Sequence, residues 1–130
     1  MLALLFPGQG SQEVGMGQDV FESSPAAREI FASADRALGF EISRYCFEGP
    51  EDDLRRTEIQ QPALLTTSIA LLSALGEAGP VEPAFVAGHS LGEYTALVAS
   101  GAMAFEDAVR LVNARGRYMQ EAVAEGTGAM

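Results

Sequence analysis

One stretch constrains the fold more than any other: a short apolar run, Ala84 to Ala87, leads directly into Gly88-His89-Ser90-Leu91-Gly92. The residues from Thr95 to Ala99 then have helix-forming composition. A Gly-x-Ser-x-Gly pattern between two such segments predicts a strand, a sharp turn and a helix. Ser90 then lies exposed at the apex as a candidate nucleophile, and the Leu91 amide faces a developing oxyanion. In the plainer interpretation, Ser90 only caps the helix.

The composition bounds the class of protein. A chain of 130 residues forms one small domain or part of a larger one. An apolar fraction of 48% and a mean hydropathy of +0.11 indicate a globular protein rather than a disordered one. The net charge is −10, and all eight basic residues are arginines. This balance argues against a nucleic-acid partner, because phosphates require a basic face.

The cysteine content and the first residues predict a cytoplasmic protein. Cys46 is the only cysteine, so no intrachain disulfide can form, which suits a reducing compartment. The apolar run from Met1 to Phe6 is too short to span a membrane and lacks the basic start of a signal peptide. We expect it to be a strand buried on both faces, as in a parallel sheet.

A glycine-rich loop follows this strand, from Pro7 to Gln12. It is neither of two known phosphate loops. A dinucleotide fingerprint that starts at Gly8 needs glycine where the chain has Glu13, and a P-loop needs lysine where it has Met16. The loop can still donate backbone amides to an anion, or it can be an ordinary connection.

Helical periodicity and capping residues predict the remaining elements. We expect helices from Pro25 to about Gly39, over 42–47, from Pro50, from Gln60-Gln61-Pro62 and over about 105–123. The helix that follows Pro62 is apolar all round, which predicts deep burial. Gln61 lies at its predicted start and is either a cap or a site residue. The acidic run 51–53 indicates solvated first-turn acids rather than a metal site, so we expect no metal.

Arg115 occupies an unusual place in the last of these helices. It falls within roughly 20° of the centre of the apolar stripe formed by Ala108, Leu111, Val112, Met119 and Ala122. An inward guanidinium must find an anion, because an unpaired buried charge is costly. That anion is either an acid of the protein or the carboxylate of a substrate, which arginine binds in bidentate fashion.

Five segments together resemble a known family. They are Phe6-Pro7-Gly8-Gln9-Gly10-Ser11-Gln12, Gln61-Pro62-Ala63-Leu64-Leu65, Gly88-His89-Ser90-Leu91-Gly92-Glu93-Tyr94, Ala114-Arg115-Gly116 and Gly126-Thr127-Gly128-Ala129-Met130. In order and spacing they are similar to the malonyl-CoA:acyl carrier protein transacylases, acyltransferases of type II fatty acid synthesis. The resemblance implies a partial α/β-hydrolase-like core, a parallel sheet flanked by helices, over 1–125. It also implies the start of a ferredoxin-like subdomain at 126–130, so we expect the N-terminal part of such an enzyme.

The resemblance also implies a role for each site residue. Ser90 matches the nucleophile that takes the malonyl group from malonyl-CoA as an ester, with no bound cofactor. Gln9 and Leu91 match the positions whose backbone amides form the oxyanion hole. Arg115 matches the arginine that pairs with the malonate carboxylate, and Gln61 matches a glutamine that lines the pocket. The acyl group then passes to the phosphopantetheine thiol of acyl carrier protein.

The chain departs from this family in one respect. Its only histidine, His89, precedes Ser90 on the strand, so its side chain should point to the opposite face of the sheet. We therefore expect no general base in this chain, no turnover by it alone, and self-association through an incomplete core. Three alternatives stay open: a polyketide-type acyltransferase fragment, a serine esterase or other hydrolase, and a non-catalytic fragment that binds carrier protein.

Overall fold

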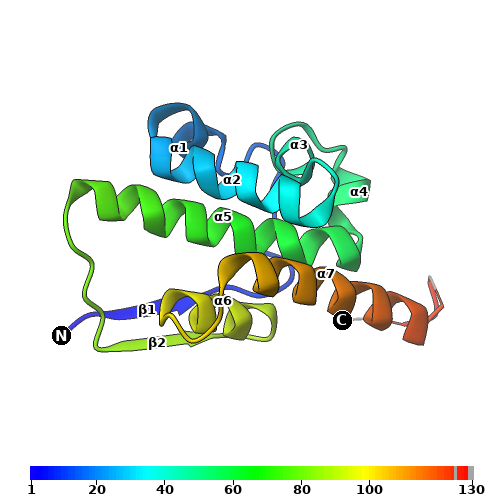
Figure 1. Ribbon diagram of the computed structural model, residues 1–130. Coiled ribbons are helices and arrows are strands. Elements are labelled where there is room, and N and C mark those ends of the chain that lie inside the picture. Colours follow the sequence, from blue (N-terminus) through cyan, green and yellow to red (C-terminus); the bar gives the residue numbers. More distant parts are fainter. Residues whose placement is uncertain (125, 129–130) are drawn as a thin grey trace.

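The computed structural model describes residues 1–124 and 126–128, which form an α/β structure. Figure 1 shows a long central helix, with smaller helices on one side and a short sheet with two further helices on the other. The elements, in chain order, are β1 (Ala3–Phe6), α1 (Gln18–Ser23), α2 (Pro25–Leu38), α3 (Ile42–Glu48), α4 (Glu51–Arg55), α5 (Thr57–Ala78), β2 (Phe85–Gly88), α6 (Leu91–Ala99) and α7 (Phe105–Ala122).

In the described part of the chain the sheet has two strands, which run parallel. Ala3 pairs with Phe85 and the register continues to Phe6 opposite Gly88. Because parallel strands end at the same edge, the glycine-rich loop after β1 and the turn after β2 emerge side by side. The predicted partial α/β core, with the serine turn between β2 and α6, is confirmed.

The expectation that β1 is buried on both faces is wrong. Phe6 is buried, whereas Leu5 is 79% exposed. Phe85, which pairs with Ala3 and lies diagonally from Leu5 on the same face, is 63% exposed. Exposure alternates along both strands, because α6 packs against one face of the sheet. No element of the described residues covers the other face. The continuous apolar run therefore overstated the burial of this strand.

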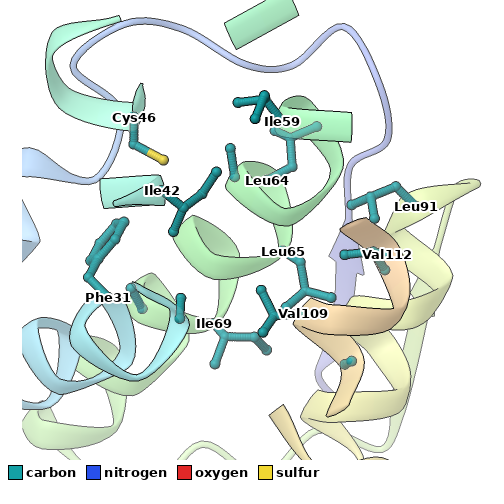
Figure 2. Close-up of a cluster of buried hydrophobic side chains, with 14 of the residues drawn as sticks. Phe31, Ile42, Cys46, Ile59, Leu64, Leu65, Ile69, Leu91, Val109 and Val112 are labelled. Carbon is teal, nitrogen blue, oxygen red and sulfur yellow. The ribbon is translucent and has the colours of Figure 1, made fainter. Parts of the chain in front are cut away.

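The core lies around α5, which packs between α2 on one side and α7 on the other. Figure 2 shows Phe31, Ile42, Leu65, Val109 and Val112 converging on this layer, and each of them is fully buried. Burial along α5 runs from Ile59 to Ala70, after which Leu71 and Leu75 are about half exposed. The predicted deep burial thus holds for the first two thirds of the helix only.

Capping fixes the start of α2 as the sequence predicts. The Ser24 hydroxyl accepts a hydrogen bond of 3.0 Å from the Ala27 amide, and Pro25 occupies the first helical position. Gly39 ends the helix in the left-handed conformation. The two short helices expected after it are also present, as α3 and α4.

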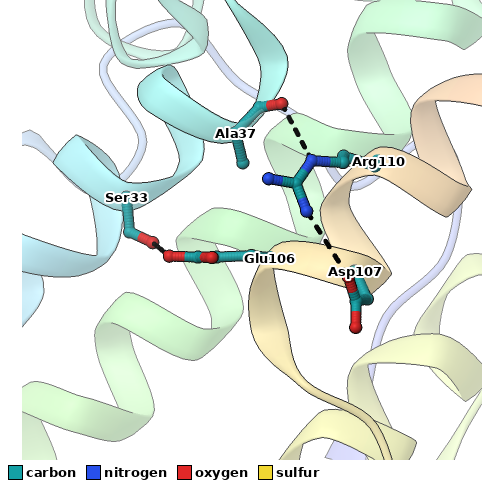
Figure 3. A network of polar contacts seen from close by, with 5 residues as sticks. All are labelled: Ser33, Ala37, Glu106, Asp107 and Arg110. Carbon is teal, nitrogen blue, oxygen red and sulfur yellow. Dashed lines mark hydrogen bonds and ion pairs between the residues drawn. The ribbon is translucent and has the colours of Figure 1, made fainter.

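Polar contacts fix α7 against α2. The Ser33 hydroxyl donates to Glu106 with a distance of 3.0 Å, and Arg110 donates from α7 to the carbonyl of Ala37 with a distance of 3.2 Å. Both contacts are drawn in Figure 3. Arg110 also pairs with Asp107 within its own helix. These contacts fix the first two turns of α7 against α2. Arg115, which lies later in the same helix, reaches Ser90.

After α7, Gly126 has a positive φ of 81°, and the Thr127 hydroxyl donates to the Ala124 carbonyl. Ala129 and Met130, where the sequence resembles the first strand of a second subdomain, lie outside the described residues. That domain boundary stays a prediction. Within 1–124 and 126–128, no helix combines the length and apolar character needed to cross a membrane, and no group of acidic, histidine or cysteine side chains is suited to a metal ion.

Candidate active site

The serine turn has the strained geometry expected of a nucleophile elbow. Ser90 has φ 52° and ψ −108°, and it is the one non-glycine residue with positive φ in the part of the chain described. Such backbone costs on the order of 1–3 kcal/mol and persists only where its surroundings enforce it. A side chain at Gly92 would collide with the Phe6 carbonyl, and one at Gly88 would collide with Gly92. Both glycines of the motif are therefore required by close packing, and Ser90 is left exposed.

The glycine-rich loop lies against this elbow. A side chain at Gly8 would sit 2.6 Å from the carbonyl oxygen of His89, so the two backbones touch there. Gln9 follows Gly8, and Leu91 opens α6 two residues after His89. Within residues 1–124 and 126–128, neither the Gln9 nor the Leu91 amide donates a hydrogen bond to the protein. Two backbone donors beside one exposed hydroxyl suit the binding of an oxyanion.

Arg115 joins α7 to the two other elements of the site. Its Nη1 donates to Gln61 Oε1 at 2.7 Å, and its Nη2 donates to Ser90 Oγ at 3.2 Å. Gln61 is 1% exposed, so its amide is a fixed anchor for the guanidinium. Three residues that the sequence singled out, from segments far apart in the chain, therefore meet at one point.

The prediction that Arg115 lies at the centre of the buried stripe is wrong. Arg115 is half-buried, and α7 buries its Ala108, Val109, Val112 and Gly116 side. Leu111, which the predicted stripe included, is 44% exposed. The packed face of the helix is turned towards α5, which leaves Arg115 at its edge. None of the ion pairs among the described residues involves Arg115, so its partner there is a neutral amide rather than an acid.

Gln61 also differs from its predicted place. α5 begins at Thr57, so Gln61 lies in the second turn of the helix and not at its start, and Pro62 is inside the helix. Gln61 is therefore not a cap. Its side-chain Nε2 donates to the sulfur of Met119 at 3.3 Å while its oxygen accepts from Arg115. Both ends of the amide are thus engaged with α7.

Two site residues were missed in the sequence. The Tyr94 ring lies under the Arg115 guanidinium, with the central carbon 5.4 Å from the ring centroid. Met119 accepts the hydrogen bond from Gln61. Each was signalled by spacing, because Tyr94 is one helical turn beyond Ser90 and Met119 is one turn beyond Arg115. Tyr94 thus contacts the Arg115 member of the Gln61–Arg115 pair, and Met119 contacts the Gln61 member.

Two open grooves border the site. One, of about 330 Å³, is lined by Arg115 and Met119 together with the apolar atoms of Leu111, Ala114, Tyr118 and Ala122. The other, of about 520 Å³, extends from Gln9 past Thr57 to the end of α7 and shares Met119 with the first. A ligand with an acidic end would find a cation and apolar walls in the smaller groove, whereas the larger one is also lined by the charged side chains of Asp52, Arg55 and Arg56.

His89 has no contact suited to a base for Ser90. Its imidazole lies by Gly8, where an added side chain would come 3.0 Å from Nδ1. In the described residues no hydrogen bond joins His89 to Ser90. Among the residues that the structure describes, the arrangement therefore brings together an exposed hydroxyl, a guanidinium and two backbone amides without a protein partner, groups that suit acyl transfer.

Comparison with known proteins supports this chemistry. The acyl transferase domain family matches the chain over residues 3–130. A malonyl CoA-acyl carrier protein transacylase of Bacillus subtilis is 54% identical over 99% of this chain, which spans 40% of that relative's length. The structure of a malonyl CoA-acyl carrier protein transacylase from Clostridium perfringens superposes with a TM-score of 0.90 at 50% identity, and covers 96% of this chain and 39% of its own.

A further solved structure holds a type II PKS acyl-carrier protein in complex with its malonyl-transacylase. It is similar at a TM-score of 0.91 and 46% identity, over 96% of this chain and 40% of its own. The match by family covers nearly every residue, including the serine elbow and Arg115. The chain therefore belongs to the acyl transferase domain family.

Proposed function

We propose that this chain is the part of a malonyl transferase that contains the serine to which the malonyl group is transferred. In this proposal Ser90 takes the malonyl group from malonyl-CoA as an ester, and the group then passes to the phosphopantetheine thiol of an acyl carrier protein in fatty acid biosynthesis. The contact of the Arg115 guanidinium with Ser90 Oγ, at 3.2 Å, is the observation that carries it. No bound cofactor is needed, because a thioester is already activated for attack. A cytoplasmic location stays a prediction.

The position of Arg115 favours an acyl group with a carboxylate close to the reacting carbon. A guanidinium has five donors, and Arg115 directs single donors at Gln61 and Ser90. The remaining donors have no partner among the described residues and are available to a carboxylate, which arginine binds with two parallel hydrogen bonds. In a malonyl group the carboxylate is two bonds from the carbonyl carbon that Ser90 attacks. A cation in contact with the nucleophile therefore suits this short diacid.

The backbone amides of Gln9 and Leu91 would hold the negative oxygen that forms during attack. Their closeness to the elbow follows from the contact between Gly8 and His89. Loss of one such donor in comparable enzymes costs about 3–4 kcal/mol of barrier. Because the donors belong to the backbone, substitution of the Gln9 side chain should change the rate far less than disruption of the loop.

The test is binding selectivity, which requires no base. Titration of the 130-residue chain with malonyl-CoA and with acetyl-CoA should give tighter binding of malonyl-CoA. Arg115→Ala should reduce malonyl-CoA affinity by about tenfold, the value of one charged hydrogen bond at a half-exposed site, and leave acetyl-CoA unchanged. Arg117→Ala is the matched control, because Arg117 is exposed on the same helix.

Equal affinities for the two thioesters in the unmodified chain would contradict the proposal. A serine esterase makes a different prediction, namely rapid hydrolysis of simple esters that is insensitive to Arg115→Ala. A non-catalytic carrier-binding fragment predicts binding of acyl carrier protein that is unchanged by Ser90→Ala, together with no preference between thioesters.

A further inference from the structure

Pro62 leaves a gap in the hydrogen-bond ladder of α5. In an α-helix the amide of residue 62 donates to the carbonyl of residue 58, but proline has no N–H. The Glu58 carbonyl therefore lacks the donor that an uninterrupted helix would supply. Asn113 fills this place from α7, with its Nδ2 donating to Glu58 O at 2.9 Å. The geometry is that of a normal N–H···O bond.

Asn113 lies next to the residues that build the site. It is two positions before Arg115 on α7, and Pro62 directly follows Gln61 on α5. One residue beyond Arg115, Gly116 lies flat on the first turn of α5, where an added side chain would come 2.6 Å from both the Thr57 carbonyl oxygen and the Glu58 Cα. The two helices are thus in backbone contact at this level.

We propose that Asn113 is a positioning residue, which fixes the Arg115 guanidinium between Gln61 and Ser90 by taking the hydrogen-bond place that Pro62 leaves empty. The inference rests on the proposed function, since its consequence is selectivity for a carboxylate-bearing acyl group. Asn113 itself does not contact the Ser90 hydroxyl or the acyl group.

The physical reason is that Arg115 has a long, flexible side chain and no acidic partner in the part of the chain described. Its place is set by neutral hydrogen bonds and by the Tyr94 ring, so it depends on where α7 holds its Cα. The close contact of Gly116 with the Thr57–Glu58 backbone sets how near the two helices approach, but a van der Waals contact alone resists sliding only weakly. A directional bond from Asn113 to a fixed carbonyl sets the remaining freedom, along the helix axis. A displacement of about 1 Å would break the contact between Arg115 and Ser90.

The chain allows a direct test, because the missing donor can be restored in α5 itself. Replacement of Pro62 by alanine returns an N–H that can bond to the Glu58 carbonyl within α5, so this carbonyl no longer depends on Asn113. The bond that ties α7 to α5 is then weakened, and Pro62→Ala alone should already lower the selectivity. The four proteins of the cycle are the unmodified chain, Asn113→Ala, Pro62→Ala and the double variant. For each, the ratio of malonyl-CoA to acetyl-CoA affinity is measured by titration calorimetry, at a temperature where the far-UV circular dichroism matches that of the unmodified chain.

Asn113→Ala should lower this ratio by roughly three- to tenfold, the value of one neutral hydrogen bond. In the Pro62→Ala background the same substitution should change it by less than about twofold. Asn113→Asp keeps the shape but removes the donor, and should show the same loss if the alanine variant does not fold. Arg117→Ala should leave the ratio unchanged.

Two results would overturn the inference while the proposed function stands. One is a lower melting temperature for Asn113→Ala with an unchanged ratio, which would make the bond structural only. The other is an equal loss in the Pro62→Ala background, which would mean that Asn113 does not act through Glu58. A failure of the proposed function is seen separately, as the absence of malonyl-CoA preference in the unmodified chain.

Discussion

Neighbouring residues determine the backbone conformation of Ser90 and the orientation of the Arg115 side chain. Ser90 keeps an unfavourable backbone because β2, α6 and the close contacts of Gly88 and Gly92 allow no other path. Arg115 keeps a fixed direction because Gln61, itself buried, accepts from one side of the guanidinium. Each residue alone is ordinary. Their combination gives an exposed hydroxyl with a cation in contact.

Cys46 provides a prediction that is independent of the site. Burial raises the pKa of its thiol from 9.0 to about 12, and the charge of Asp35 acts in the same direction against the hydrogen bond from Thr67. The unfolded thiol loses its proton near pH 9 and the folded one retains it. The contribution to stability is therefore complete below pH 9 and is lost as the pH rises towards 12.

The expected result is a fall in the free energy of unfolding of roughly 1 kcal/mol between pH 8 and pH 10 from this residue. Denaturant titrations of the unmodified chain and of Cys46→Ala over this range measure it. The alanine variant retains every other ionisable group of the chain, so the difference between the two profiles reports the Cys46 thiol. Parallel pH profiles for the two would show that the thiol ionises as readily in the folded chain as in the unfolded one.

At the scale of elements, the close approach of α5 and α7 determines the site. Gly116 allows this approach, because the Thr57–Glu58 backbone lies where its side chain would be. Asn113 then bonds across the same contact. The position of α7 along α5 is thus set by the contacts that Gly116 and Asn113 make with the backbone of α5. Arg115 extends from this position towards Ser90.

Gly116→Ala should therefore destabilise the chain by about 1–3 kcal/mol, since the added methyl group has rigid backbone against it. Gly76→Ala is the matched control. Gly76 lies in α5 with open space around it, so alanine should stabilise the chain by about 0.5–1 kcal/mol. Thermal and denaturant unfolding measure both. Similar shifts for the two variants would mean that the two helices do not touch at Gly116.

Local signals predicted the elements well, and packing explains where they failed. The cap at Ser24, the glycine stop at Gly39 and the strand before Ser90 are local, so the sequence determines them. The buried side of α7 depends on where α5 lies, which periodicity along one helix cannot specify, and so Arg115 was placed too centrally. Pro62 suggested a helix start at 60–62, but α5 begins at Thr57. Proline is tolerated inside the helix, where Asn113 of α7 supplies the hydrogen bond that Pro62 cannot donate to the Glu58 carbonyl.

The candidate site shows the same division. Ser90, Arg115 and Gln61 were identified through the motifs that surround them, and the structure brings all three together. Tyr94 ends the serine motif and Met119 belongs to the apolar stripe of α7, but neither was given a role in the site, although both lie one helical turn from a residue that was. Asn113 could not have been identified at all, because its role depends on a gap in the ladder of a distant helix.

On the scale of the whole molecule, one face of the sheet is apolar and uncovered in the part of the chain described. Leu5 and Phe85 on this face are 79% and 63% exposed, and each of the two strands has one unpaired edge. Contiguous apolar surface beside free strand edges favours association. The chain also spans about 40% of the length of the relative from Bacillus subtilis.

We therefore predict reversible self-association at micromolar concentration, measured by sedimentation velocity over a dilution series. The combined substitution of Leu5 and Phe85 by glutamine should shift the equilibrium towards monomer. Leu71→Gln is the control, because Leu71 is 47% exposed on α5, away from the sheet face. A sedimentation coefficient that stays monomeric at every concentration would contradict this prediction.

The central claim, that Ser90 accepts an acyl group which Arg115 selects, has one most direct test. The chain is incubated with equal concentrations of malonyl-CoA and acetyl-CoA, with imidazole added as the base that no described residue supplies to Ser90. Peptide mass spectrometry then measures each ester. We predict a malonyl ester on Ser90 in at least about tenfold excess over acetyl, and loss of that excess in Arg115→Ala. Esters on other residues, or equal malonyl and acetyl labelling of Ser90, would contradict the claim.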